Sequence, residues 1–393
     1  MYQEKGCSRI PGKVGMKRSV SLFLAAVIVL AACTAFSGCS KKDYDLVLIT
    51  DGGSVTNRAY AQSCWDGMCE FSIDHGIDCR YFIPSNTEKE TLLSSIEGAI
   101  EGGAKTVVTA GLCFETAVYE ASRKYPDVRF ILIDGEPRQD QNGAASPQPN
   151  TAAVTFLSEQ SGYMAGYAAV SDGYTKLGVI SGYPTADTMA YTCGFLQGAQ
   201  NAAQLRGSNV DLIYHCTGDT LENDANKKTA AEMYSSGTEL IFTCGGDVYR
   251  SVIKAAEEER GYVICSDADR RYDSSCVVTS AVKNVSGAVI RVLRSIYESK
   301  DFEATFGGRT TVLGAAENCT GLPESVINDT NGDPFDRFIR FTAQAYSDEL
   351  ARLASGGVSV KRSVTLSEDE VYPGANELTG QLGLQNVTVT AVQ

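Results

Sequence analysis

Apolar residues along the chain gather in short runs that alternate with segments of helical spacing. Between the runs, apolar positions recur every three to four residues, over 87–102, 114–125, 158–170, 187–205, 222–236, 246–259, 284–299 and 336–354. The β-rich runs are DLVLIT, DCRYFIP, KTVVTA, VRFILID, AAVTF, KLGVIS, VDLIYH, TELIFT, YVICSD and CVVTSA. Such strand–helix–strand repetition predicts an α/β fold with parallel sheets and right-handed crossovers.

Ten strands are many for one sheet, so we predict two doubly wound parallel-sheet lobes joined by a hinge. The first crossing is expected in the polar stretch QDQNGAASPQPN and the return at Ser280–Lys283. We predict a signal peptide (1–32), an N-terminal lobe (43–150 with 282–305), a C-terminal lobe (151–281 with 306–355) and an unassigned tail (356–393).

Ligands of doubly wound folds bind at the carboxyl ends of the strands. Asp51 stands at such an end, before Gly52 and Gly53, and Asn57 opens the helix that follows. The Asp51 carboxylate could accept hydrogen bonds from the vicinal hydroxyls of a sugar, or it could cap that helix. Asp267 repeats the pattern in VICSDAD, which favours the ligand interpretation.

Lys283 follows a strand end and could meet a ligand hydroxyl or Asp267; a solvated surface lysine is the alternative. Tyr60 and Tyr191 come one from each predicted lobe and could sandwich a flat ring, although the pattern by itself favours two core tyrosines. We expect no catalytic residues, because no nucleophile, phosphate-loop or metal-protease motif occurs. No metal and no cofactor is predicted, since the chain has only two histidines and no pair of cysteines at C-x-x-C spacing.

The N-terminus predicts a lipid-anchored protein. Lys17 and Arg18 precede SVSLFLAAVIVLAAC, an apolar run too short to span a bilayer comfortably. Small residues then precede cysteine twice, so Cys33 is the predicted lipidation site and Cys39 the alternative. A plain cleaved signal peptide is the other interpretation.

The acidic composition bears on partners. Removing residues 1–32 takes away five basic residues and one acidic residue, which moves the formal net charge from −14 to −18. This negative net charge argues against nucleic acid as a partner, because the phosphate backbone is also negatively charged. Contact with the membrane would be through the lipid alone.

Several segments resemble the basic membrane lipoprotein family, the purine-nucleoside-binding lipoproteins of ABC uptake systems. They occur in order over roughly 45–300 and begin with LVLITDGGSVTNRAYAQSCWDGM, followed by KYPDVRFILID, TFLSEQSGYMAGYAAV, KLGVISGYPTADTMAYTCGFLQGA, GTELIFTCGGDVYRSVIKAA and GYVICSDADRRYDSSCVVTSAVKNVSGAVIRVL. The family is similar to type I periplasmic binding proteins and implies a nucleoside held between two lobes.

The resemblance implies particular roles. Tyr60 and Tyr191 take the positions of the two aromatic residues that stack on the base. Asp51, Asp267 and Lys283 take positions near the ribose, and Gly245 takes the position of a backbone contact. Three positions depart from the family pattern. Ala61 replaces the asparagine that would meet the base, Glu115-Thr116 stands where an aspartate would, and Arg270 replaces a glutamine. Thr116 offers a hydroxyl there, and Glu115 or Arg270 could compensate.

The function predicted from these observations is that of an extracytoplasmic solute-binding protein that passes a nucleoside to an ABC permease. A ligand-sensing surface lipoprotein for another small polar ligand is the first alternative. A secreted enzyme of the nucleoside hydrolase type is the second, disfavoured because Asp51 has no second acid nearby.

Overall fold

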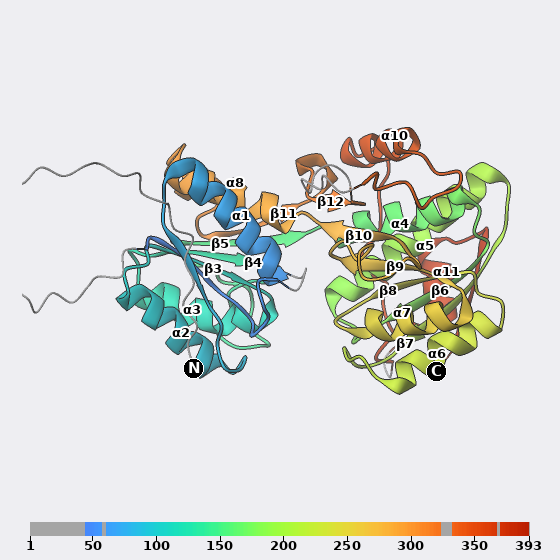
Figure 1. The fold of residues 1–393 in the computed structure, drawn as a ribbon, viewed down its shortest axis with the longest axis horizontal. Coiled ribbons are helices and arrows are strands. Elements are labelled where there is room, and N and C mark those ends of the chain that lie inside the picture. Colours follow the sequence, from blue (N-terminus) through green and yellow to red (C-terminus); the bar gives the residue numbers. More distant parts are fainter. Residues whose placement is uncertain (1–43, 57–59, 324–331, 368–369, 393) are drawn as a thin grey trace, which may run out of the picture. The chain divides into compact units, whose positions relative to one another are not determined.

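The structure, a computed structural model, describes residues 44–56, 60–323, 332–367 and 370–392. The described chain divides into two compact units (Figure 1). The first contains residues 44–54, 64–153 and 292–309, and the second contains 55–63, 154–291 and 310 onward. The predicted signal peptide, Cys33, Cys39 and Asn57 lie outside the described residues.

The first unit is built on a six-stranded sheet of order β11-β5-β4-β3-β1-β2, of which β5 from Val154 and β11 from Thr310 group with the second unit. The pairs β1–β2, β1–β3 and β3–β4 are parallel. The strands are β1 (Leu46–Ile49), β2 (Cys79–Phe82), β3 (Thr106–Ala110), β4 (Arg129–Ile133), β5 (Thr151–Phe156) and β11 (Arg309–Leu313). β1 and β3 are buried along their whole length, as expected for strands covered by helices on both faces.

Helices cover both faces of this sheet. The helices are α1 (Tyr60–His75), α2 (Lys89–Glu101), α3 (Glu115–Lys124), α8 (Val285–Tyr297) and the short α9 (Phe302–Thr305), with a 3₁₀ turn at Leu112–Phe114. α2 and α3 lie on one face, and α1 and α8 on the other (Figure 1). Phe71 of α1 and Tyr297 of α8 pack with ring centroids 5.8 Å apart, which joins the two helices on that face.

The second unit is built on a seven-stranded sheet of order β12-β10-β9-β8-β6-β7-β13. Its strands are β6 (Lys176–Ser181), β7 (Val210–Cys216), β8 (Leu240–Cys244), β9 (Tyr262–Asp267), β10 (Val277–Lys283), β12 (Thr320–Gly321) and β13 (Val387–Ala391). All neighbours are parallel except β12, which pairs antiparallel with β10. The carboxyl ends of β6, β8, β9 and β10 therefore meet at one edge of the sheet.

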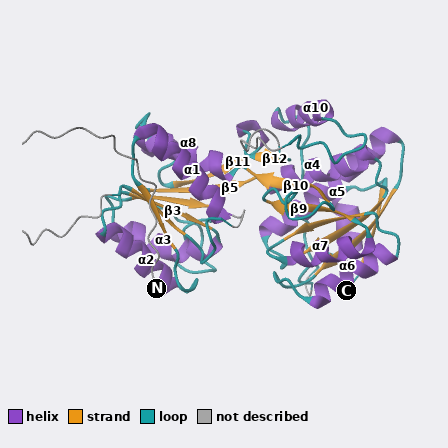
Figure 2. Cartoon of the chain, viewed as in Figure 1, coloured by secondary structure: helices purple, strands orange, loops and turns teal. Residues whose placement is uncertain are grey.

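Paired helices cover the faces of the second sheet (Figure 2). They are α4 (Ser158–Asp172) with α5 (Ala186–Arg206) and α6 (Asp224–Ser235) with α7 (Val248–Glu259). Near the C-terminus, α10 (Ala343–Ala354) packs on α4, and α11 (Ala375–Leu382) packs on α5 and β13. A second 3₁₀ turn spans Ala315–Glu317. α4 and α5 approach closely through glycine. A Cβ added at Gly198 would meet the Tyr163 backbone carbonyl, and one at Gly166 would meet that of Phe195.

The ten predicted strands are all present, and the predicted α/β class with parallel sheets is confirmed. Two details differ. The last predicted helix begins at Ala343 rather than near 336, because Asp172 Oδ1 accepts the backbone N–H groups of residues 339–341 and Thr342 caps the helix. Ser280–Lys283, the predicted return crossing, is part of strand β10.

The domain boundaries stay a prediction. When residues are grouped by their contacts with one another, the chain returns to the first unit at Val292, within α8. The described part of the tail 356–393 groups with the second unit. There β13 pairs in parallel with β7, and Leu378 of α11 is fully buried.

Candidate functional site

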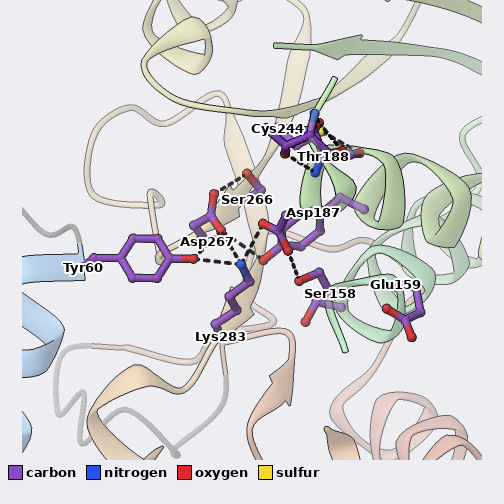
Figure 3. Close-up of polar contacts among 12 residues, drawn as sticks. Tyr60, Ser158, Glu159, Asp187, Thr188, Cys244, Ser266, Asp267 and Lys283 are labelled. Carbon is purple, nitrogen blue, oxygen red and sulfur yellow. Dashed lines mark hydrogen bonds and ion pairs between the residues drawn. The ribbon is translucent and has the colours of Figure 1, made fainter. Parts of the chain in front are cut away.

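Four polar side chains converge at the carboxyl edge of the second unit's sheet (Figure 3). The Lys283 Nζ lies 2.7 Å from Asp187 Oδ2, 3.4 Å from Asp267 Oδ1 and 2.8 Å from the Tyr60 hydroxyl. All four residues belong to the second unit, since the first turn of α1 groups with it. We call Tyr60, Asp187, Asp267 and Lys283 the lysine cluster.

Lys283 is the centre of the lysine cluster. It is the last residue of β10, and its side chain is fully buried, whereas those of Asp187 and Asp267 are 36% and 26% exposed. Its ammonium lies 5.5 Å from the Tyr60 ring centroid and 5.3 Å from that of Tyr191. A buried ammonium requires such partners, because burying it unpaired would be strongly unfavourable. The alternative of a solvated surface lysine is therefore wrong.

Asp267 is held at the end of β9 in an uncommon backbone conformation. Its φ is 68°, in the left-handed region that non-glycine residues seldom occupy. Ser266 Oγ donates to Oδ2 at 3.0 Å, while the Tyr60 and Tyr191 hydroxyls donate to Oδ1 at 3.0 and 3.3 Å. Strained backbone at a convergence of polar groups is typical of functional sites.

Asp187 is a member of the cluster that the sequence analysis missed. Thr185 caps α5 through the Thr188 backbone N–H, so the helix begins just before Asp187. Asp187 and Tyr191 are four residues apart and so lie on one face of α5. The spacing of four residues between Asp187 and Tyr191, which was a predicted site residue, is the sequence signal from which Asp187 could have been predicted. Ser158, which begins α4, donates to Asp187 Oδ1.

Tyr191 has only 1% of its surface exposed. Its ring packs 6.3 Å from that of Phe242 in the core, and its hydroxyl points to Asp267. In this conformation it contributes a hydroxyl to the site rather than an open ring face. Tyr60 is only partly buried.

Gly245 follows β8 at the same edge. Its φ is 100°, and an added Cβ would lie 3.0 Å from the Gly182 backbone. Both the conformation and the close approach require glycine here.

Asp51 and Thr116 belong to the first unit. Asp51 is exposed after β1 and accepts the Gly53 backbone N–H at 3.0 Å; it does not cap α1, which begins nine residues later at Tyr60. Burial, and secondly the Asp51 charge, raise the pKa of the Cys113 thiol to about 11. Thr116 is partly buried in the first turn of α3.

The two residues expected to compensate for lost base contacts have other partners. Glu115 pairs with Arg138 at 2.9 Å and accepts the Glu136 backbone N–H. The Arg270 guanidinium lies 4.4 Å over the Tyr249 ring. The His215 side chain on β7 has its Nδ1 3.0 Å from the Val392 backbone oxygen.

Nothing in the described ranges suggests a metal centre: no three His, Cys, Asp or Glu side chains group there in a way that could hold an ion. The lysine cluster presents donors and acceptors side by side, which suits reversible binding of a small polar molecule.

Comparison with known proteins identifies the family. The model of PnrA-like substrate-binding proteins of ABC transporters (Bmp) matches residues 45–351. The chain belongs to this family. The predicted resemblance is confirmed, and the family is one of substrate-binding proteins rather than enzymes.

Individual relatives are distant. The chain is 27% identical over 232 residues to the ABC transporter nucleoside-binding protein BmpA of Lactococcus lactis, a match covering 50% of this chain and 63% of that protein. It is 23% identical to basic membrane protein A of Borreliella burgdorferi over 78% of this chain and 87% of that protein. An uncharacterized lipoprotein of Pyrococcus abyssi is 22% identical, with 79% and 76% covered.

Solved structures agree on the fold. An ABC transporter solute-binding protein from Aeropyrum pernix superposes with a TM-score of 0.64 at 18% identity, covering 83% of this chain and 94% of that chain. One from Conexibacter woesei gives 0.62 at 20% identity, covering 81% and 99%. These likenesses support the type I periplasmic binding-protein fold.

Proposed function

We propose that this solute-binding protein binds a nucleoside and passes it to an ABC permease. The observation that carries the proposal is the lysine cluster, in which Lys283 lies between two carboxylates at the carboxyl edge of a parallel sheet. Carboxylates and an ammonium together suit sugar hydroxyls, which both donate and accept hydrogen bonds. The nucleoside-binding relative from Lactococcus lactis supports this ligand class, although the match covers 63% of its length.

Asp267→Asn tests the ligand assignment. The change keeps the shape of the side chain but removes the charge that the sugar hydroxyls would meet, so adenosine affinity should fall roughly tenfold to a hundredfold. Isothermal titration calorimetry measures it. Asp273→Asn is the matched control, because Asp273 lies after the same strand, is 27% exposed and pairs with Arg270. Equal losses in both variants, or an unchanged affinity in Asp267→Asn, would contradict the assignment.

We further propose that a lipid on Cys33, or alternatively on Cys39, anchors the protein at the extracytoplasmic face of the cell membrane. The small residues that precede each cysteine at the end of the apolar run motivate this. Across the described part of the chain, helices long and apolar enough to cross a membrane are absent. Labelling with a fatty acid should mark the wild type and disappear when both cysteines become serine. Labelling that persists in the double variant would refute the anchor.

A further inference from the structure

The Tyr60 hydroxyl bridges the two charged groups of the lysine cluster. It lies 2.8 Å from Lys283 Nζ and 3.0 Å from Asp267 Oδ1. An ammonium can only donate and a carboxylate can only accept, so the hydroxyl accepts from Lys283 and donates to Asp267. Figure 3 shows the phenol pointing into the space between them.

Few chemical groups can take this place. A carboxylate or phosphate would accept from Lys283, but it would bring a further negative charge beside Asp187 and Asp267. An ammonium would donate to Asp267 but would face the positive charge of Lys283. A neutral hydroxyl satisfies both neighbours at once, as the phenol of Tyr60 does.

The two tyrosines on Asp267 differ in their freedom to move. Tyr60 is the first residue of α1 and is only partly buried, so its side chain can turn away from the cluster. Tyr191 sits inside α5, packs near Phe242 and is 1% exposed. Displacing Tyr191 would open the core, whereas displacing Tyr60 would not.

We propose that the Tyr60 hydroxyl occupies a ligand-hydroxyl position of this site, and that a hydroxyl of the bound ligand replaces it. The inference rests on the proposed nucleoside function and deepens it. Tyr60 then determines specificity: a ligand must present a hydroxyl that both accepts from Lys283 and donates to Asp267 in order to displace the phenol. Neutral ligands with a free sugar hydroxyl meet this requirement.

Tyr60→Phe separates the roles of ring and hydroxyl. Without added ligand, the variant should melt about 2–6 °C below the wild type, since it loses hydrogen bonds to charged groups. Adenosine should bind three- to tenfold more tightly, because it no longer competes with the phenol hydroxyl. 2′,3′-Dideoxyadenosine, which lacks both ring hydroxyls, should gain nothing.

Tyr191→Phe is the matched control. It removes a donor from the same Asp267 oxygen at 3.3 Å, but from a side chain that does not leave. Its melting temperature should also fall, and adenosine should bind no more tightly than to the wild type.

The outcomes distinguish this inference from the proposed function. If the wild type binds adenosine and Tyr60→Phe binds it equally or more weakly, a ligand hydroxyl does not replace the Tyr60 hydroxyl, while the nucleoside function stands. An unchanged melting temperature in Tyr60→Phe would overturn the bridging role itself. If neither protein binds adenosine, guanosine or inosine, the nucleoside assignment fails and the replacement fails with it.

Discussion

At the scale of single residues, Lys283 is the group on which the lysine cluster depends. Its side chain is fully buried between Asp187 and Asp267. Lys283→Met would leave the two carboxylates facing each other without a counter-charge. We expect the free energy of unfolding, measured by urea denaturation, to fall by about 1–3 kcal/mol. This is less than the usual cost of breaking a buried ion pair, because both carboxylates are partly exposed to water.

Lys105→Met is the matched control. Lys105 also pairs with an aspartate, Asp45, at 2.8 Å, but its side chain is 72% exposed. Exposed ion pairs contribute little, so the loss should be much smaller than that of Lys283→Met. Similar losses in both variants would mean that burial of Lys283 does not make its ion pairs important.

Sequence reasoning found part of the site for an identifiable reason. Asp267 and Lys283 end neighbouring parallel strands, and strand ends can be read from the apolar runs. Asp187 could not be found in that way, because it enters the site from a helix. The partners of Glu115 and Arg270 were unpredictable too, since Arg138 and Tyr249 are brought beside them only by tertiary packing.

At the scale of elements, the close contact of α4 and α5 positions the site, because these helices carry Ser158 and Asp187. We expect Gly198→Ala to destabilise the protein by about 1–3 kcal/mol, since the new methyl group would meet the Tyr163 backbone carbonyl and separate the helices. Thermal unfolding provides the measurement. Gly380→Ala, in α11 with no atom within 4 Å of the new Cβ, should be neutral or slightly stabilising.

The C-terminal strand β13 provides a second test. Val387 is 2% exposed and Thr388 on the opposite face is exposed, while both residues pair with β7. Val387→Asp would bury a charge and should cost about 3 kcal/mol or more, whereas Thr388→Asp should cost less than about 1 kcal/mol. Chemical denaturation of the two variants compares them directly. Equal effects would show that β13 does not pack on the core.

This tail was not placed from sequence, although it carried a weak signal. Val387, Thr388, Val389 and Thr390 alternate apolar and polar residues, as a half-buried strand does. Only five residues follow the pattern, and α11 before them is eight residues long. Such short elements depend on tertiary contacts, here with β7 and α5, which a linear pattern does not reveal.

At the scale of the whole molecule, two parallel-sheet units and the family match agree on a solute-binding protein of an ABC transporter. The long alternation of strands and helices made this fold predictable, because each crossover repeats the same local signal. The ligand was less predictable. Ala61 offers no polar group to a base, while Glu115 and Arg270 have other partners. The lysine cluster, where we propose that the sugar binds, has by contrast a buried lysine and two carboxylates.

The most direct test of the nucleoside assignment is mass spectrometry of the ligand that the protein retains when it is purified without denaturation. We expect a purine nucleoside with an intact ribose, and calorimetry should then show 2′-deoxyadenosine binding roughly tenfold to a hundredfold more weakly than adenosine. Guanosine should differ from adenosine by less than that. Recovery of an amino acid or a sugar phosphate, or equal binding of the deoxy and ribo forms, would contradict the account.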